Sequence, residues 1–113
     1  MNITMTKTDE VLIVKIGYEH LDASNIEKFK TEINLLLNGA GAMVFDLSAI
    51  QFIDSSGLGA FLSCQRRVNA GGGELVLCAL QSTVRTIFEM VRMSKIIKIF
   101  DTQEEAIQAL PTL

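Results

Sequence analysis

Two adjacent serines follow an aspartate near the middle of the chain, and they are the residues best placed to take part in chemistry. Asp54-Ser55-Ser56 comes directly after the apolar pair Phe52-Ile53 and directly before Gly57-Leu58-Gly59. All three polar residue types commonly cap the N-terminus of a helix, and capping alone explains their presence. A helix start also stabilises an anion by about 0.3 to 1 kcal/mol and offers free N–H groups. The same segment could therefore hold a phosphoserine.

A phosphate at this position would affect binding more than folding. Phosphorylation adds about −1.5 to −2 charges, here beside the carboxylate of Asp54. A hundredfold loss of affinity requires only about 2.8 kcal/mol, and an unfavourable contact between like charges can cost several kcal/mol. One phosphate could thus switch the binding of a partner without refolding the domain.

The residue types that catalysis or metal binding requires are scarce. His20 is the only histidine, and a nucleophile elbow around Ser55 would need glycine where Ile53 stands. His20, Cys64 and Cys78 follow no zinc-ligand spacing. We therefore predict a protein that is not an enzyme and has no catalytic residues and no metal, with His20 in a loop and both cysteines as reduced core thiols.

The glycines do not complete a nucleotide-binding motif. Gly57-Leu58-Gly59 begins like a dinucleotide fingerprint, but Leu62 stands where the third glycine belongs and no Walker-type lysine follows. The sequence therefore predicts no cofactor and a tight strand-to-helix turn with close backbone packing at Gly57 and Gly59. Gly71-Gly72-Gly73 is expected to end a helix.

Composition favours one small acidic domain over residues 1–113. The chain is 49% hydrophobic and 20% charged, with a net charge of −3. These values argue against disorder, and the net charge argues against attraction to nucleic acid or anionic lipid. No apolar run reaches the ~18 residues of a membrane span and no signal peptide is evident, so we expect a cytoplasmic protein that binds neither nucleic acid nor membrane. Oligomeric state stays open.

Two clusters of side chains have both a functional and a purely structural interpretation. Arg66 and Arg67 are adjacent, but no aromatic residues interleave with the basic side chains, which favours a solvated face over a nucleic-acid site. Met90 and Met93 are at helical spacing, and they suit either an adaptable docking surface or ordinary packing at the edge of the core.

Hydrophobic periodicity predicts the elements that must position the serines. The order ββαβαβαβα follows from a hairpin at 3–6 and 11–16, a helix from 22 to 38, a strand at 43–47, a helix after the 54–59 turn to about 68, a strand at 74–78, a helix at 82–91, a strand at 96–100 and a final helix after 102. Crossovers through helices indicate an α/β domain whose mixed, mostly parallel sheet is covered by helices. Turns at the carboxyl ends of such strands usually carry the functional site.

Polar residues mark where three of these helices begin. Asp22 or Ser24 can cap the first helix, and Ser24 with Glu27 fits a capping box. Ser82 opens the third helix, and Thr102 with Glu105 fits a second capping box at the start of the last one. Asn38-Gly39 predicts a left-handed stop for the first helix.

The serine segment resembles a known family. Ile53-Asp54-Ser55-Ser56-Gly57-Leu58-Gly59 is similar to the signature of STAS-domain anti-sigma factor antagonists, and the order of elements resembles theirs over essentially the whole chain. Leu21-Asp22 before the first helix and Gly72-Gly73-Glu74-Leu75 before a strand also resemble that family. Gly17 to Asp22 departs from it, because this segment is longer than the common Gly-Glu-Leu/Ile-Asp.

The resemblance implies regulation by partner switching. A serine kinase that is also the anti-sigma factor would phosphorylate the protein, a PP2C-type phosphatase would restore it, and only the unphosphorylated form would bind the kinase and free the sigma factor. The phosphoacceptor would be Ser55, with Ser56 as second choice. Asp22 and Asp54 would help partner docking or orient the serine. The partner-binding set implied by the family is Asp22, Asp54, Ser56, Gly57, Leu58 and Gly59.

A different function is compatible with the same family. The chain could be a constitutive, unphosphorylated STAS subunit of a transporter or of a signalling complex, and it would then use the same surface without modification. Phosphorylation of Ser55 distinguishes the two hypotheses.

Overall fold

Single strands or short groups of strands alternate with helices along residues 2–110, the part of the chain that the computed structural model describes. The strands are β1 (Ile3–Thr8), β2 (Val11–Ile16), β3 (His20–Leu21), β4 (Ala42–Asp46), β5 (Phe52–Ile53), β6 (Glu74–Cys78) and β7 (Ile99–Phe100). The helices are α1 (Ile26–Leu37), α2 (Ser55–Ala70), α3 (Ser82–Met90), the short 3-10 helix η1 (Met93–Lys95) and α4 (Gln103–Ala109). The predicted order ββαβαβαβα is confirmed, and β3 and β5 are two additional short strands.

The main sheet has five strands in the order β1-β2-β4-β6-β7. β1 and β2 form the expected antiparallel hairpin, whereas β2, β4, β6 and β7 run parallel to one another. Each parallel step needs a crossover, which the helices provide. The prediction of a mixed, mostly parallel sheet covered by helices is therefore confirmed.

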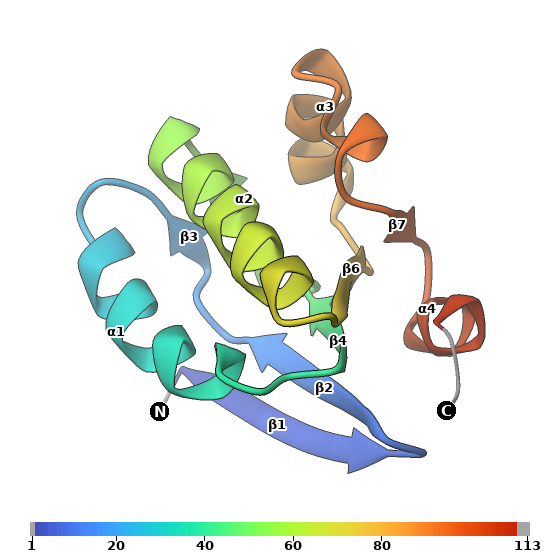
Figure 1. Cartoon of the computed structure of the whole chain (residues 1–113). Coiled ribbons are helices and arrows are strands. Elements are labelled where there is room, and N and C mark those ends of the chain that lie inside the picture. Colours follow the sequence, from blue (N-terminus) through green and yellow to red (C-terminus); the bar gives the residue numbers. More distant parts are fainter. Residues whose placement is uncertain (1, 111–113) are drawn as a thin grey trace.

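Helices cover both faces of this sheet, and an aromatic cluster fixes α2 in its layer. In Figure 1, α1, α2 and α3 lie over one face and α4 lies on the other side, in agreement with the two apolar clusters of the core. Phe61 of α2 lies with its ring centroid 5.8 Å from Phe29 of α1, 6.0 Å from Phe45 of β4 and 6.3 Å from Phe88 of α3. Such aromatic contacts hold the serine-bearing helix against both neighbouring helices and the sheet.

The start of α1 differs from the prediction. The helix begins at Ile26 with Asn25 in the cap position, and no side chain caps it. The expected capping box of Ser24 with Glu27 is therefore wrong. The Asp22 carboxylate instead accepts a hydrogen bond from the Ser24 N–H at 2.9 Å. This bond closes a local turn, and a short polar side chain that is used in such a turn is not available to cap the helix. The predicted left-handed stop is confirmed, since Gly39 has φ +70°.

Two other boundaries are also corrected. Residues 96–98 were expected in a strand, but Ile96 and Ile97 both donate their N–H groups to the Met93 carbonyl, so β7 contains only the last two residues of the predicted segment. Helix α2 begins directly at Ser55, so Gly57 and Gly59 lie inside the helix rather than in a turn before it. His20 lies in β3 rather than in a loop.

The helix ends and starts elsewhere follow the sequence. Gly71 caps the C-terminus of α2 and Gly72 has φ +87°, as the glycine run predicts. The hydroxyl of Thr102 accepts a hydrogen bond from the Glu105 N–H at 3.1 Å and caps α4. Helix α3 begins at Ser82 as expected, and Gln81 occupies its cap position.

Both cysteines should resist alkylation in the folded protein. Cys64 and Cys78 are free and buried, as predicted, and burial raises the pKa of each thiol to about 12. The reactive thiolate is therefore scarce and shielded. With iodoacetamide at pH 8 we expect no adduct on the native protein and two adducts in denaturant, measured by intact mass. Rapid labelling of the native protein would contradict the described core.

Candidate serine site at the start of helix α2

A short parallel pair of strands brings two distant segments together at the serines. β3 pairs with β5, with His20 beside Phe52 and Leu21 beside Ile53. The Asp54 N–H donates to the Leu21 carbonyl at 3.3 Å, directly before α2 begins. The loop before α1 is thus held against the start of α2.

Asp54 organises this junction with both of its carboxylate oxygens. Oδ1 accepts hydrogen bonds from the Ser56 N–H at 2.8 Å and the Gly57 N–H at 3.2 Å, which caps α2. Oδ2 accepts a hydrogen bond from the Ala23 N–H at 3.2 Å, across from the loop before α1. The capping predicted from the sequence is confirmed, and the same side chain also ties the two segments together.

Replacing Asp54 should remove both its cap on α2 and its hydrogen bond to the Ala23 N–H. We expect Asp54→Ala to lower the free energy of unfolding by about 1 to 2 kcal/mol, because the loss of an N-cap costs about 0.5 to 2 kcal/mol. Asp54→Asn is the matched control, because asparagine caps equally well without the charge. Urea unfolding of the three proteins measures the difference, and equal stability of wild type and Asp54→Ala would contradict the capping role.

Asp22 shapes the neighbouring loop from within. Its Oδ1 accepts hydrogen bonds from the Ser24 N–H and hydroxyl at 2.9 and 2.5 Å, and its Oδ2 lies 3.1 Å from Nδ1 of His20. The hydrogen bonds from Ser24, with a further contribution from His20, hold the pKa of the Asp22 carboxyl below its usual value. Asn25 closes the loop, because its side chain donates to the His20 carbonyl and accepts from the Asp22 N–H. This carboxylate therefore remains charged and fixed near the serines.

The two serines differ in accessibility. Ser55 is exposed and is the first residue of α2. Ser56 is half-buried, and its backbone N–H is bound by Asp54. Leu58 is half-buried and packs against the core. Of the two serines, Ser55 is therefore the more accessible to another protein.

The two glycines of the motif have opposite environments. A Cβ on Gly57 would lie 2.5 Å from Cγ1 of Ile53 and 2.8 Å from the Leu21 carbonyl oxygen. Gly57 therefore lets α2 pack closely on β3 and β5, as predicted for this residue. A Cβ on Gly59 would meet nothing within 4 Å, and Gly59 is exposed. The expectation of close intramolecular packing at Gly59 is wrong, and the fold does not require glycine there.

Two residues near the site were not predicted from the sequence. Phe52 on β5 is 51% exposed although it is a large apolar side chain next to the serine segment. Tyr18 is buried; it packs edge-on against Phe29 at 6.3 Å and donates its hydroxyl hydrogen to Glu32. Tyr18 thereby fixes the segment Gly17 to Asp22, whose greater length is the departure from the family pattern. The exposure of Phe52 could not be predicted, because a strand of two residues shows no hydrophobic periodicity.

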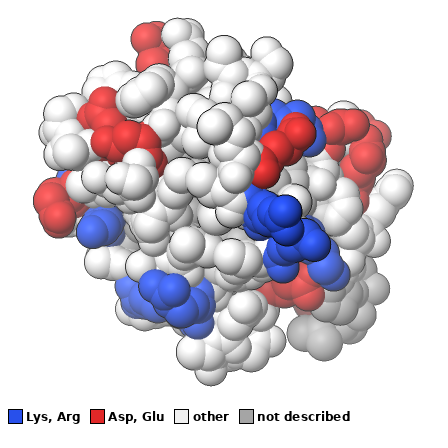
Figure 2. Space-filling view, turned by 90° about the horizontal axis from the view of Figure 1, so that it is seen from above, with Lys and Arg blue, Asp and Glu red and all other residues white. Residues whose placement is uncertain are grey.

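The end of the molecule that carries the start of α2 has a broad uncharged area with charged groups around it. Figure 2 looks down on this end and shows a broad uncharged surface, with acidic groups mainly in the upper half of the view and basic groups mainly in the lower half. A surface of this kind suits contact with another protein, because the core of a protein interface is depleted of charged residues. An added phosphate would change its character.

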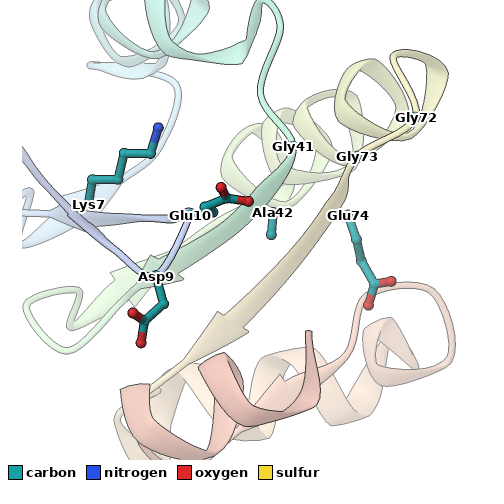
Figure 3. Close-up of a pocket in the computed structure, with 8 residues that line it drawn as sticks. All are labelled: Lys7, Asp9, Glu10, Gly41, Ala42, Gly72, Gly73 and Glu74. Atoms are coloured by element: carbon teal, nitrogen blue, oxygen red, sulfur yellow. The ribbon is translucent and has the colours of Figure 1, made fainter. Parts of the chain in front are cut away.

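A hollow lies at the opposite end of the sheet from the serines, and its side chains are not organised around one residue as those near Asp54 are. It has a volume of about 340 Å³ and is lined by the β1–β2 turn and by the segments that precede β4 and β6. Figure 3 shows that the side chains of Asp9, Glu10 and Glu74 point in different directions around it. Within residues 2–110 no three His, Cys, Asp or Glu side chains gather closely enough to hold a metal ion. None of the helices described is long and apolar enough to span a membrane.

Comparisons with known proteins agree with the fold. The family model for the STAS domain matches residues 2–106. The anti-sigma F factor antagonist of Paenibacillus polymyxa is 30% identical over 112 residues, which cover 97% of this chain and 95% of that protein. Relatives of this kind are regulatory proteins and not enzymes.

Solved structures show the same similarity. A Thermotoga maritima protein described as a candidate anti-sigma factor antagonist has a TM-score of 0.85 at 25% identity and covers 96% of this chain and 93% of that one. The Bacillus cell fate determinant SpoIIAA in its phosphorylated form has a TM-score of 0.67 at 25% identity, covering 94% and 96% of the two chains.

Proposed function

The chain belongs to the STAS domain family, and from that premise we propose that it is an anti-sigma factor antagonist that acts by partner switching. In this proposal the unphosphorylated protein binds a serine kinase that is also an anti-sigma factor, and the sigma factor is released. Phosphorylation of Ser55 blocks the binding, and a PP2C-type phosphatase reverses it. In this proposal the exchange of partners takes place in the cytoplasm.

The exposure of Ser55 at the start of a helix that Asp54 caps is the observation that carries the proposal. The capping bonds to Asp54 come from Ser56 and Gly57, so a phosphate on Ser55 breaks none of them. The positive end of the helix dipole would stabilise the phosphate by about 0.3 to 1 kcal/mol. The phosphorylated protein is therefore expected to keep its fold.

Partner binding would change because the new charge enters an interface. Asp54 and Asp22 already place two carboxylates at this junction, held there by Ala23 and Ser24. Phosphorylation adds about −1.5 to −2 charges beside them. A kinase that accommodates the uncharged Ser55 hydroxyl beside these two carboxylates would meet additional like-charge repulsion, which can cost several kcal/mol at an interface.

The remaining residues of the motif receive separate roles in the proposal. Asp22 and Asp54 set the shape of the binding surface, and Gly57 keeps α2 packed on the short sheet. Ser56, Leu58 and Gly59 contribute to contact with the partner. Gly59 suits that role best, because an exposed glycine in a helix allows another backbone to approach closely.

Affinity capture from the native organism tests the function. The wild-type protein is immobilised, and the proteins it retains are identified by mass spectrometry. We expect recovery of a serine kinase of the anti-sigma type, with little recovery by a Ser55→Asp bait. Recovery of a transporter subunit instead, equally by both baits, would contradict partner switching and favour the constitutive-subunit hypothesis.

A further inference from the structure

Exposed apolar side chains concentrate in one short segment that the proposed function does not use. Within the described residues, Met90, Val91 and Ile96 are 78%, 50% and 52% exposed. Met90 is the last residue of α3, whereas Val91 and Ile96 lie between α3 and β7; Figure 1 shows the end of α3 at the upper edge of the molecule. We call the exposed residues from 90 to 96 the 90–96 surface; they are Met90, Val91, Arg92, Ser94, Lys95 and Ile96.

The segment is held firmly although its outer side chains have no partners in the core. Met93 and Ile97 are 2% and 0% exposed and anchor it from below. The Gln65 side chain of α2 donates a hydrogen bond to the Ile96 carbonyl. Arg92 has φ +58°, a left-handed conformation that favours glycine, and it reverses the chain between α3 and η1. The surface is therefore a preformed feature rather than a loose loop.

Its charge is opposite to that of the whole protein. Arg92 and Lys95 are exposed, and among residues 2–110 neither forms an ion pair. No Asp or Glu occurs from residue 90 to residue 100, whereas the chain as a whole carries −3. Two unpaired cations thus stand among three exposed apolar side chains.

We propose that the 90–96 surface docks an acidic amphipathic segment of a protein partner. Carboxylates of that segment would pair with Arg92 and Lys95, and its apolar side chains would cover Met90, Val91 and Ile96. Methionine suits such a contact because its flexible thioether adapts to different shapes. In this proposal the contact does not require the serine switch, and none of its residues belongs to the motif at the start of α2.

A peptide segment matches this surface better than an anionic membrane does. Membrane-surface helices present an apolar face over many turns and several basic residues, whereas this patch spans one helix end and a 3-10 turn. Exposed Glu89 and Asp101 flank the segment in the sequence, so its basic character is confined to a short stretch that suits a narrow peptide better than a plane of anionic headgroups. Shape and charge therefore both favour a protein segment.

Amide NMR titration tests the proposal with two defined probes. One probe is a fifteen-residue helical peptide of Glu and Leu arranged as an amphipathic helix, and the other is vesicles of phosphatidylglycerol. With the peptide we expect saturable shifts centred on residues 90–96, in wild type and in Ser55→Asp alike. The double variant Arg92→Glu with Lys95→Glu should weaken peptide binding at least tenfold.

Matched controls separate this surface from general charge effects. Lys7→Glu with Lys28→Glu changes the net charge equally at exposed sites elsewhere, and should leave the peptide affinity within twofold of wild type. Met90→Ser should weaken binding without any change of charge. The proposal is overturned by absence of saturable shifts, by equal weakening in the control pair, or by binding to the vesicles without binding to the peptide.

Discussion

Replacing Ser55 by aspartate is expected to weaken kinase binding by about a hundredfold or more while the fold keeps its stability. The expected loss corresponds to about 2.8 kcal/mol, within the range of a like-charge contact at an interface. Ser55 is exposed at the start of α2, so the free energy of unfolding should change by no more than about 0.5 kcal/mol. Titration calorimetry with the captured kinase and urea unfolding measure the two quantities.

Ser63→Asp is the matched control for this experiment. Ser63 is also exposed on α2, two turns further along the helix, and the substitution makes the same change of charge. We expect its affinity for the kinase to remain within about threefold of wild type, which is about 0.7 kcal/mol. Wild-type affinity of Ser55→Asp, of Ser55→Glu and of the enzymatically phosphorylated protein together would refute the switch.

The glycine pair predicts opposite effects from the same substitution. Gly57→Ala would place a methyl group 2.8 Å from the Leu21 carbonyl oxygen and 2.5 Å from Cγ1 of Ile53. The backbone carbonyl is fixed in the β3–β5 pair, so α2 must shift, and overpacking of this kind typically costs about 1 to 3 kcal/mol. Gly59→Ala meets no atom within 4 Å and should stabilise the helix by about 0.5 to 1 kcal/mol.

Binding separates the two glycines in a second way. If the partner backbone approaches α2 at Gly59, then Gly59→Ala will lose kinase affinity at least tenfold although it is the more stable protein. Gly57→Ala should lower the affinity for the kinase only indirectly, because the start of α2 is displaced. Urea unfolding and calorimetry on both variants give the comparison. A Gly59→Ala protein that is less stable than wild type, or that binds the kinase normally, would contradict the role given to this residue.

The sequence predicts the helices and the long strands because their apolar periods are regular. The Asp54 cap is also predictable, since residue type and position before an apolar helix are sufficient. The strands β3 and β5 are not, because two residues carry no period and their pairing depends on tertiary contact between Leu21 and Ile53. For the same reason the exposure of Phe52 has no sequence signal.

Other features of the site required the packed structure because several local arrangements compete. Asp22 was a reasonable helix cap, but hydrogen bonds to Ser24 and His20 compete with capping, and the helix begins four residues later. The sequence does not distinguish the roles of Gly57 and Gly59. Only the positions of Leu21 and Ile53 in the structure show that the fold requires glycine at residue 57. Tertiary contacts thus decide the roles within a motif whose existence the sequence already indicates.

Mapping of phosphate on the protein from its native cells tests the central claim most directly. Intact mass reveals the modification, and fragmentation between Ser55 and Ser56 assigns it to one residue. We expect a single phosphate adduct, located on the exposed Ser55. The fraction of the protein that carries it should differ among growth, starvation and stress. A protein that carries no phosphate under any of these conditions, or carries it only on the half-buried Ser56, would contradict the proposed switch.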